Sequence, residues 1–262
     1  MSAFGPNASR VRWFFARALH GPGPKLALVD AVIVLVVALV VASVWRRTGG
    51  PRAELEAIVP LIGTALRYSV GLPLAYGALR AMQDDNKAGY VALARRRGIS
   101  AGQYLRYRAV GAGLLVAVVV AGPMVIVSLV LSGFGGGVEG ALARASLVFP
   151  SLFVGAGTGL LFGFGAVALG AWVSSRPVAF VALLGTAALG ALLEGVVRGA
   201  AGHALRQLAS PLRALDDAQS AAFAAPNSLA RGLSAIVSVA VVLLVTERIA
   251  ERTVDAQSES AP

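Results

Sequence analysis

The segment from residue 80 to residue 108 contains the side chains of this chain that are best suited to charged contacts with a protein partner. Asp84 and Asp85 are adjacent, and Arg95, Arg96 and Arg97 follow farther along the same segment. Carboxylates near the start of a helix and guanidinium groups in its last turn both interact favourably with the helix dipole. The pattern predicts a short helix over residues 85–97 that can make charge-assisted contacts at its two ends.

Residues on either side of the arginines predict where this helix ends and the next one begins. Gly98 can adopt the left-handed conformation that ends a helix. Ser100 and Gln103 have the spacing of a capping box, which starts the next helix. Because the segment also carries seven of the chain's 23 Lys and Arg residues, a second interpretation stays open, namely an ordinary basic loop without a partner.

Arg67 and Glu194 are the only ionisable residues well inside long apolar segments. Such residues in a membrane either line a path or are held by neighbouring helices. We therefore expect Arg67 and Glu194 to form a pair on a translocation path, or each to be a structural anchor. An arginine at the centre of a membrane helix costs about 2.5–3.5 kcal/mol on insertion, so Arg67 must face protein or water.

Several kinds of chemistry require motifs that this sequence lacks. Its only lysines are Lys25 and Lys87, and neither follows the glycine-rich phosphate-binding loop of an ATPase. The chain has no cysteine, and its two histidines, His20 and His203, are far apart, so no metal site is predicted. It also lacks the zinc-protease and serine-hydrolase motifs. We expect no catalytic residue and no cofactor in this chain.

The elements that position these residues are predicted to be membrane helices. The mean hydropathy is +0.75, 57% of the residues are hydrophobic and only 14% are charged. The formal net charge of +10 does not indicate nucleic-acid binding, because the basic residues cluster beside apolar segments, as they do in membrane proteins. The expected fold is an all-α polytopic membrane protein that binds no nucleic acid.

Six apolar segments are long enough to cross a bilayer, which takes about 20 helical residues. In the fourth segment Gly155, Gly159 and Gly163 recur at four-residue spacing, and small residues at that spacing allow close helix packing. The six predicted spans cover residues 26–45, 57–79, 109–131, 147–173, 178–197 and 229–246.

Two further stretches are amphipathic rather than spanning. Residues 9–20 place apolar side chains on one helical face and arginines on the others, which predicts an interfacial helix suited to anionic lipid. Residues 198–228 predict two short amphipathic helices at or in the outer membrane surface, the second starting at Ser210 and Pro211.

The distribution of Lys and Arg predicts the orientation. If the N-terminus is cytoplasmic, the first three extramembrane segments carry 11 basic residues inside and 3 outside. Positive charge favours the cytoplasmic side. We expect both termini in the cytoplasm.

This order of elements resembles the permease subunits of the second export class of ABC transporters. Those proteins have an N-terminal elbow helix, a coupling helix between spans two and three, and small re-entrant helices before the last span. The pattern Asp84-Asp85-x-x-x-Gly89 is similar to the haem-exporter B permeases of cytochrome c maturation. The run from Gly165 to Leu169 and on to Arg176 is similar to their junction between spans four and five.

The resemblance implies a permease of the bacterial inner membrane that works as a dimer with a second permease copy. Each half would bind a separate ABC ATPase subunit, which would hold ATP and Mg, at Asp84, Asp85, Gly89, Arg95, Arg96 and Arg97. An ion-coupled secondary carrier and a non-transporting membrane scaffold remain as alternatives from other classes.

Overall fold

The computed structural model describes residues 10, 13–16, 22–48, 52–132, 137–194, 196, 199–223 and 229–259. Within these ranges every regular element is a helix, which confirms the all-α prediction. Five helical stretches are long and apolar enough to cross a membrane, the architecture of a multi-pass membrane protein. They are Pro24–Trp45, Ala57–Lys87, Ala101–Leu131, Ala145–Trp172 and Gly232–Ala256.

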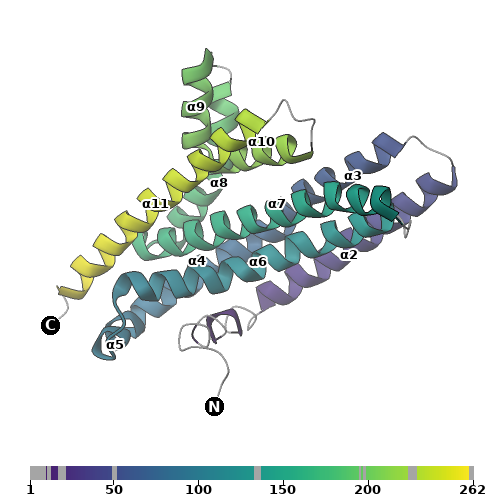
Figure 1. The fold of residues 1–262 in the computed structure, drawn as a ribbon. Helices are drawn as coiled ribbons and strands as arrows, with labels where there is room; N and C mark the ends of the chain where they lie inside the picture. The colour runs from purple at the N-terminus through teal and green to yellow at the C-terminus, as the bar shows by residue number, and fades with distance from the viewer. Residues whose placement is uncertain are drawn as a thin grey trace.

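Two long helices, α6 (Ala101–Ser132) and α7 (Gly137–Trp172), pack side by side along the middle of the bundle (Figure 1). About half of each corresponding span is buried, whereas α2 (Pro22–Arg47) and α11 (Leu229–Glu259) lie at the periphery and are mostly exposed.

Helix α2 places small residues toward the bundle and large apolar residues outward. Its buried positions are alanines, whereas valines and leucines such as Leu26, Val29 and Val36 are exposed. In water this distribution would leave a large apolar surface unprotected. In a bilayer the same surface lies against lipid, so the arrangement supports the assignment of α2 as a membrane helix. The buried alanines of α2 are Ala27, Ala31, Ala38 and Ala42.

The second membrane helix is a continuous rod made of three parts. It consists of α3 (Arg52–Leu66), a π-helical turn η1 (Arg67–Gly71) and α4 (Leu72–Lys87). The wide turn ends two residues before Pro73, which has no N–H to donate to the preceding turn. The helix itself continues past residue 79, the predicted end of the span, to Lys87. In this extension Gln83 Nε2 donates to the carbonyl of Val173 at 2.6 Å.

The predicted fifth span, residues 178–197, corresponds to α8 (Arg176–Glu194). This helix is not among the five stretches that meet the membrane criteria within the described residues. The helix itself is observed, and the sixth crossing stays a prediction.

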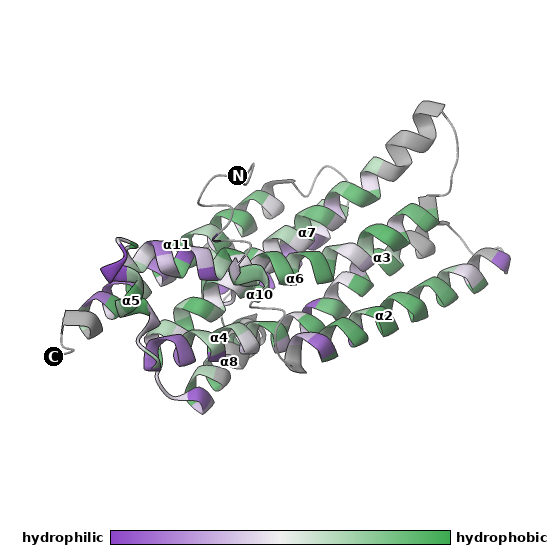
Figure 2. Cartoon of the chain, turned by 90° about the horizontal axis from the view of Figure 1, so that it is seen from below, coloured by the Kyte–Doolittle hydropathy of each residue, from purple (hydrophilic) through white to green (hydrophobic). Residues whose placement is uncertain are grey.

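The two predicted outer helices are α9 (Gly199–Ala209) and α10 (Pro211–Phe223). As expected, Ser210 caps α10, since the N–H of Arg213 donates to Ser210 Oγ at 3.4 Å. At the end of the bundle away from the C-terminal end of α2, the short helix α5 (Tyr90–Arg96) lies near the C-terminal end of α11 (Figure 1). Hydrophilic residues gather around α5 and on the adjoining end of α11 (Figure 2).

Candidate functional site

The short helix in the 80–108 segment is smaller than the sequence predicts. Asp84 and Asp85 lie in the last turn of α4, where the Ala88 N–H donates to the Asp84 carbonyl at 3.0 Å, so α4 continues past both carboxylates. The chain then breaks at Gly89, whose φ of 69° is left-handed. The predicted helix over residues 85–97 is therefore wrong, and α5 occupies only Tyr90–Arg96.

The C-terminal boundary of α5 agrees with its local sequence signals. Arg95 and Arg96 lie in its last turn, and Gly98 has a φ of 75°. The capping box forms in both directions: the Gln103 N–H donates to Ser100 Oγ and the Ser100 N–H donates to Gln103 Oε1, each at 3.2 Å. Two left-handed glycines and a reciprocal cap thus bound α5, which gives it a defined direction relative to α4 and α6.

Asp85 is fully buried and points into the bundle rather than toward a partner. The Tyr104 hydroxyl donates to Asp85 Oδ2 at 2.9 Å, and Arg108 Nε lies 3.2 Å from the same oxygen. A carboxylate at the C-terminus of a helix is repelled by the negative end of the helix dipole. The Tyr104 hydroxyl and the Arg108 guanidinium, both on α6, offset this repulsion. We call Asp85, Tyr104 and Arg108 the Asp85 cluster; it fixes the end of α4 to the start of α6.

The neighbouring charges connect the 80–108 segment to two other parts of the chain. Arg176 at the start of α8 donates to Asp84 Oδ1 at 2.5 Å. Arg95 on α5 forms an ion pair with Asp255 near the end of α11. These pairs are partly exposed and each contributes little to stability, but together they tie α5 and its flanks to α8 and α11.

The remaining predicted partner-binding residues face outward. Arg96 and Arg97 are exposed, and no ion pair is found for either within the described residues. Tyr90 and Leu93 on the same helix are also exposed. The surface of α5 therefore combines guanidinium groups with apolar side chains, a composition typical of protein and lipid interfaces.

Part of the predicted amphipathic helix over residues 9–20 is described, namely residue 10 and residues 13–16, and these are helical. The rest of that prediction lies outside the described residues. Phe14 is buried edge-on against Tyr104, with ring centroids 5.3 Å apart, and the Arg108 guanidinium lies over the Phe14 ring at 5.6 Å. Gly111 on α6 provides the space, because a Cβ there would meet the Phe14 backbone at 3.0 Å.

A second polar cluster lies inside the bundle around Arg67. This arginine is fully buried in η1, forms an ion pair with Asp216 on α10, and donates to Gln219 Oε1. Gln219 Nε2 in turn donates to the carbonyl of Pro60 at 2.6 Å, and the Tyr68 hydroxyl donates to Asp216 Oδ2 at 3.2 Å. We call Arg67, Tyr68, Asp216 and Gln219 the Arg67 cluster.

One of the two interpretations of the sequence paired Arg67 with Glu194, and the other made each residue a structural anchor; the structure pairs Arg67 with Asp216. The side chain of Glu194 lies outside the described residues. A signal for Asp216 was present in the pattern of α10. Leu212, Leu215, Asp216 and Gln219 share one helical face, so two polar groups continue the buried apolar stripe.

The three glycines of α7 lie at the contact with α6. A Cβ at Gly155 would collide with the side chain of Ala121, and one at Gly159 would collide with the backbone of Gly113. At Gly163 it would come within 2.5 Å of the Ala109 carbonyl oxygen. The absence of side chains here lets the two helix backbones approach closely.

No group of three or more metal-ligating side chains is found in the part of the chain that the structure describes. Comparison of the chain with protein-family models gives no match, and comparison with curated protein sequences gives none either. The function is therefore argued from the two clusters and the exposed surface of α5.

Proposed function

We propose that this chain is the permease subunit of an ATP-driven ABC exporter of the bacterial inner membrane, with both termini in the cytoplasm. It would provide the path across the membrane, and a separate subunit would bind ATP and Mg. The observation that carries the proposal is the attachment of α5, a short exposed helix whose flanks are bonded to several membrane helices at one end of the bundle.

The surface of α5 supports the partner-binding half of the proposal. Tyr90, Leu93 and Arg96 are exposed on a helix that is too short to fold alone and that is bounded by Gly89 and Gly98. An ABC ATPase would receive this surface in a groove, with the apolar side chains buried and the guanidinium groups at the rim. The chain lacks its own phosphate-binding loop, so ATP hydrolysis must come from such a partner.

The contacts that connect α5 and its flanks to the bundle support the second part of the proposal, that motion of the ATPase is transmitted to the membrane helices. A partner that moves α5 would displace the end of α4 and the start of α6 together, because Asp85, Tyr104 and Arg108 connect them. Rigid-body motion of packed helices is a common form of switching. An unattached basic loop would absorb the same displacement without moving the membrane helices.

Close packing along α6 and α7 extends this argument into the membrane. Because Gly155, Gly159 and Gly163 bring the two backbones together, the pair would move as one unit. A second permease copy would complete the path between the two halves. Arg67 on η1 is our candidate for a residue near that path.

The Arg67 cluster also favours a second candidate function, an ion-coupled secondary carrier. Buried ionisable pairs next to irregular helix turns occur at the binding sites of such carriers. Transport by proteoliposomes that contain only this chain, driven by a pH gradient and without ATP, would establish the carrier and exclude the ABC proposal.

The test uses the full-length chain, tagged and purified in mild detergent from the cells that naturally produce it. We expect a companion protein with a phosphate-binding loop in comparable amount, identified by mass spectrometry, and ATP hydrolysis in the purified complex. The variant Leu93→Asp with Arg96→Glu should lose the companion. Arg252→Glu, an exposed change on α11, is the matched control and should retain it. A wild-type complex without an ATPase, or an unchanged complex in the α5 variant, would refute the proposal.

A further inference from the structure

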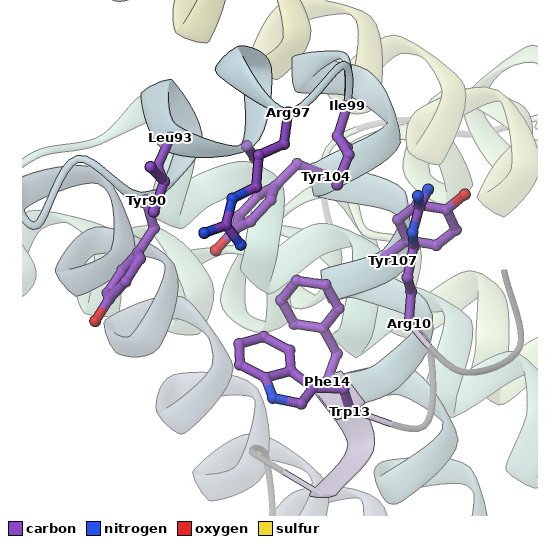
Figure 3. A pocket seen from close by; sticks show the side chains of 10 residues that line it. Arg10, Trp13, Phe14, Tyr90, Leu93, Arg97, Ile99, Tyr104 and Tyr107 are labelled. Carbon is purple, nitrogen blue, oxygen red and sulfur yellow. The ribbon is translucent and has the colours of Figure 1, made fainter. Parts of the chain in front are cut away.

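A cavity of about 360 Å³ lies between the N-terminal helical segment, α5 and the start of α6 (Figure 3). Trp13 and Phe14 approach it from one side and the guanidinium of Arg97 from the other (Figure 3). Leu93 and Ile99 complete its apolar wall. None of its lining residues is acidic.

We propose that this cavity binds an anionic phospholipid, with the phosphate between Arg10 and Arg97 and the acyl chain against Trp13 and Ile99. This site does not depend on the proposed transport function. It concerns a ligand from the bilayer itself and gives the N-terminal segment a specific role.

The positive charge of the cavity favours a lipid with a negatively charged headgroup. Arg10 and Arg97 are the two cations of the cavity, and neither has a carboxylate partner among the described residues. Arg10 is held 5.7 Å from the centroid of the Tyr107 ring, so one cation is already positioned. Basic pockets beside membrane helices bind the phosphate of anionic lipids.

The walls and the location select a lipid over a soluble anion. Trp13 and Tyr90 are exposed beside the cavity, and Trp and Tyr side chains prefer the boundary between membrane and water. The cavity adjoins the N-terminal end of α6, the helix that contains the candidate membrane span Ala101–Leu131. An inorganic anion would gain nothing from the apolar wall, whereas an acyl chain would cover it.

The position of the cavity couples its occupancy to the Asp85 cluster. Phe14 forms one wall, and its ring is packed on Tyr104, which donates to Asp85. A lipid that holds the N-terminal segment against α5 would therefore also support the contact between α4 and α6.

Tryptophan fluorescence tests the proposal directly, because the chain has only three tryptophans. Trp45 and Trp172 are exposed on the membrane helices and are replaced by phenylalanine, which leaves Trp13 as the reporter. The protein is reconstituted in vesicles with increasing fractions of phosphatidylglycerol brominated on its acyl chains, and in parallel with brominated phosphatidylcholine. We expect the anionic lipid to quench Trp13 at a much lower mole fraction.

The variants Arg10→Gln and Arg97→Gln should each weaken this preference about fivefold. Arg97→Lys should retain most of it, and Arg252→Gln on α11 is the control with the same change of charge. Millimolar inorganic phosphate should not reverse the quenching. Equal quenching by the two lipids, a preference that survives both glutamine variants in well-folded protein, or reversal by phosphate would each overturn the proposal.

Discussion

The guanidinium of Arg67 lies against the carboxylate of Asp216, although the two residues are 149 positions apart in the sequence. This contact connects the π-helical turn of the second membrane helix to α10, a short helix that is not itself long enough to span. It explains how an arginine is tolerated inside an apolar segment: the side chain is fully buried, its charge is balanced by Asp216, and two of its nitrogens are hydrogen-bonded.

Removing one partner of this buried pair should destabilise the protein strongly. We expect Asp216→Ala to lower the free energy of unfolding by about 3–5 kcal/mol, because Arg67 is then left as an unbalanced buried charge. Unfolding in detergent, followed by circular dichroism, measures the change. The charge-free double variant Arg67→Met with Asp216→Leu is the control and should lose much less. Equal losses in the single and double variants would contradict a paired role.

The Asp85 cluster predicts that substitution of Asp85 destabilises the protein more than substitution of the adjacent Asp84. Asp85→Asn leaves the buried Arg108 without its anionic partner and should cost about 3–5 kcal/mol. Asp84→Asn changes only partly exposed ion pairs and should cost at most about 1 kcal/mol. Thermal unfolding of the two variants under the same conditions makes the comparison. Similar losses would mean that Asp85 is not the connection between α4 and α6.

The close approach of α6 and α7 predicts opposite outcomes at two glycines of α7. Gly159→Ala places a methyl group against the backbone of Gly113, which cannot move aside cheaply, and should destabilise by about 1–3 kcal/mol. Gly165→Ala points into open space and should be neutral or stabilise by up to about 1 kcal/mol. The stabilities of the two variants are compared by the fraction of protein that remains monomeric after heating, measured by size-exclusion chromatography. Destabilisation by Gly165→Ala as large as that by Gly159→Ala would rule out backbone contact as the cause.

Gly89 should tolerate only residues that accept a left-handed conformation. Gly89→Ala should cost about 1–2 kcal/mol locally and speed amide hydrogen exchange in α5, since its φ is 69°. Gly89→Asn should be closer to wild type. Gly77→Ala, at a helical glycine with open space around it, is the control. Unchanged exchange in Gly89→Ala would show that the turn does not set the position of α5.

The orientation can be tested with single cysteines, because the natural chain has none. In intact cells a membrane-impermeant maleimide should label Thr48→Cys, at the end of α2. Arg96→Cys on α5 and Arg252→Cys on α11 should be labelled only after the cells are opened. Labelling of Arg96→Cys in intact cells would place α5 outside and exclude contact with a cytoplasmic ATPase.

Local signals in the sequence predicted local structure well. The capping box at Ser100 and Gln103 and the left-handed turn at Gly98 depend on neighbouring residues only, and both are present. Asp84 and Asp85 show where this reasoning fails. Acidic residues before a glycine fit the start of a helix, but here long-range contacts with Arg176 and Arg108 allow them at the end of one.

Long-range partners were less predictable because a single sequence does not show which helices meet. Arg67 was expected to face protein or water, and it is fully buried by protein, but the second half of the chain offers eight acidic residues as possible partners. Only the packing of α10 against η1 identifies Asp216. Similarly, the glycine spacing in α7 predicted a close helix contact but could not identify Gly113 and Ala117 on α6 as the facing residues.

The π-helical turn at Arg67–Gly71 determines the rotational phase between the two ends of the second membrane helix. Each helical residue advances a side chain by about 100° around the axis, and a wide turn contains one residue more than an ordinary turn. Without it, every side chain beyond Gly71 would be turned by about that angle relative to Arg67. If Arg67 still faced Asp216, Asp85 would then point away from Tyr104. The irregular turn therefore allows one helix to make both contacts, Arg67 with Asp216 and Asp85 with Tyr104.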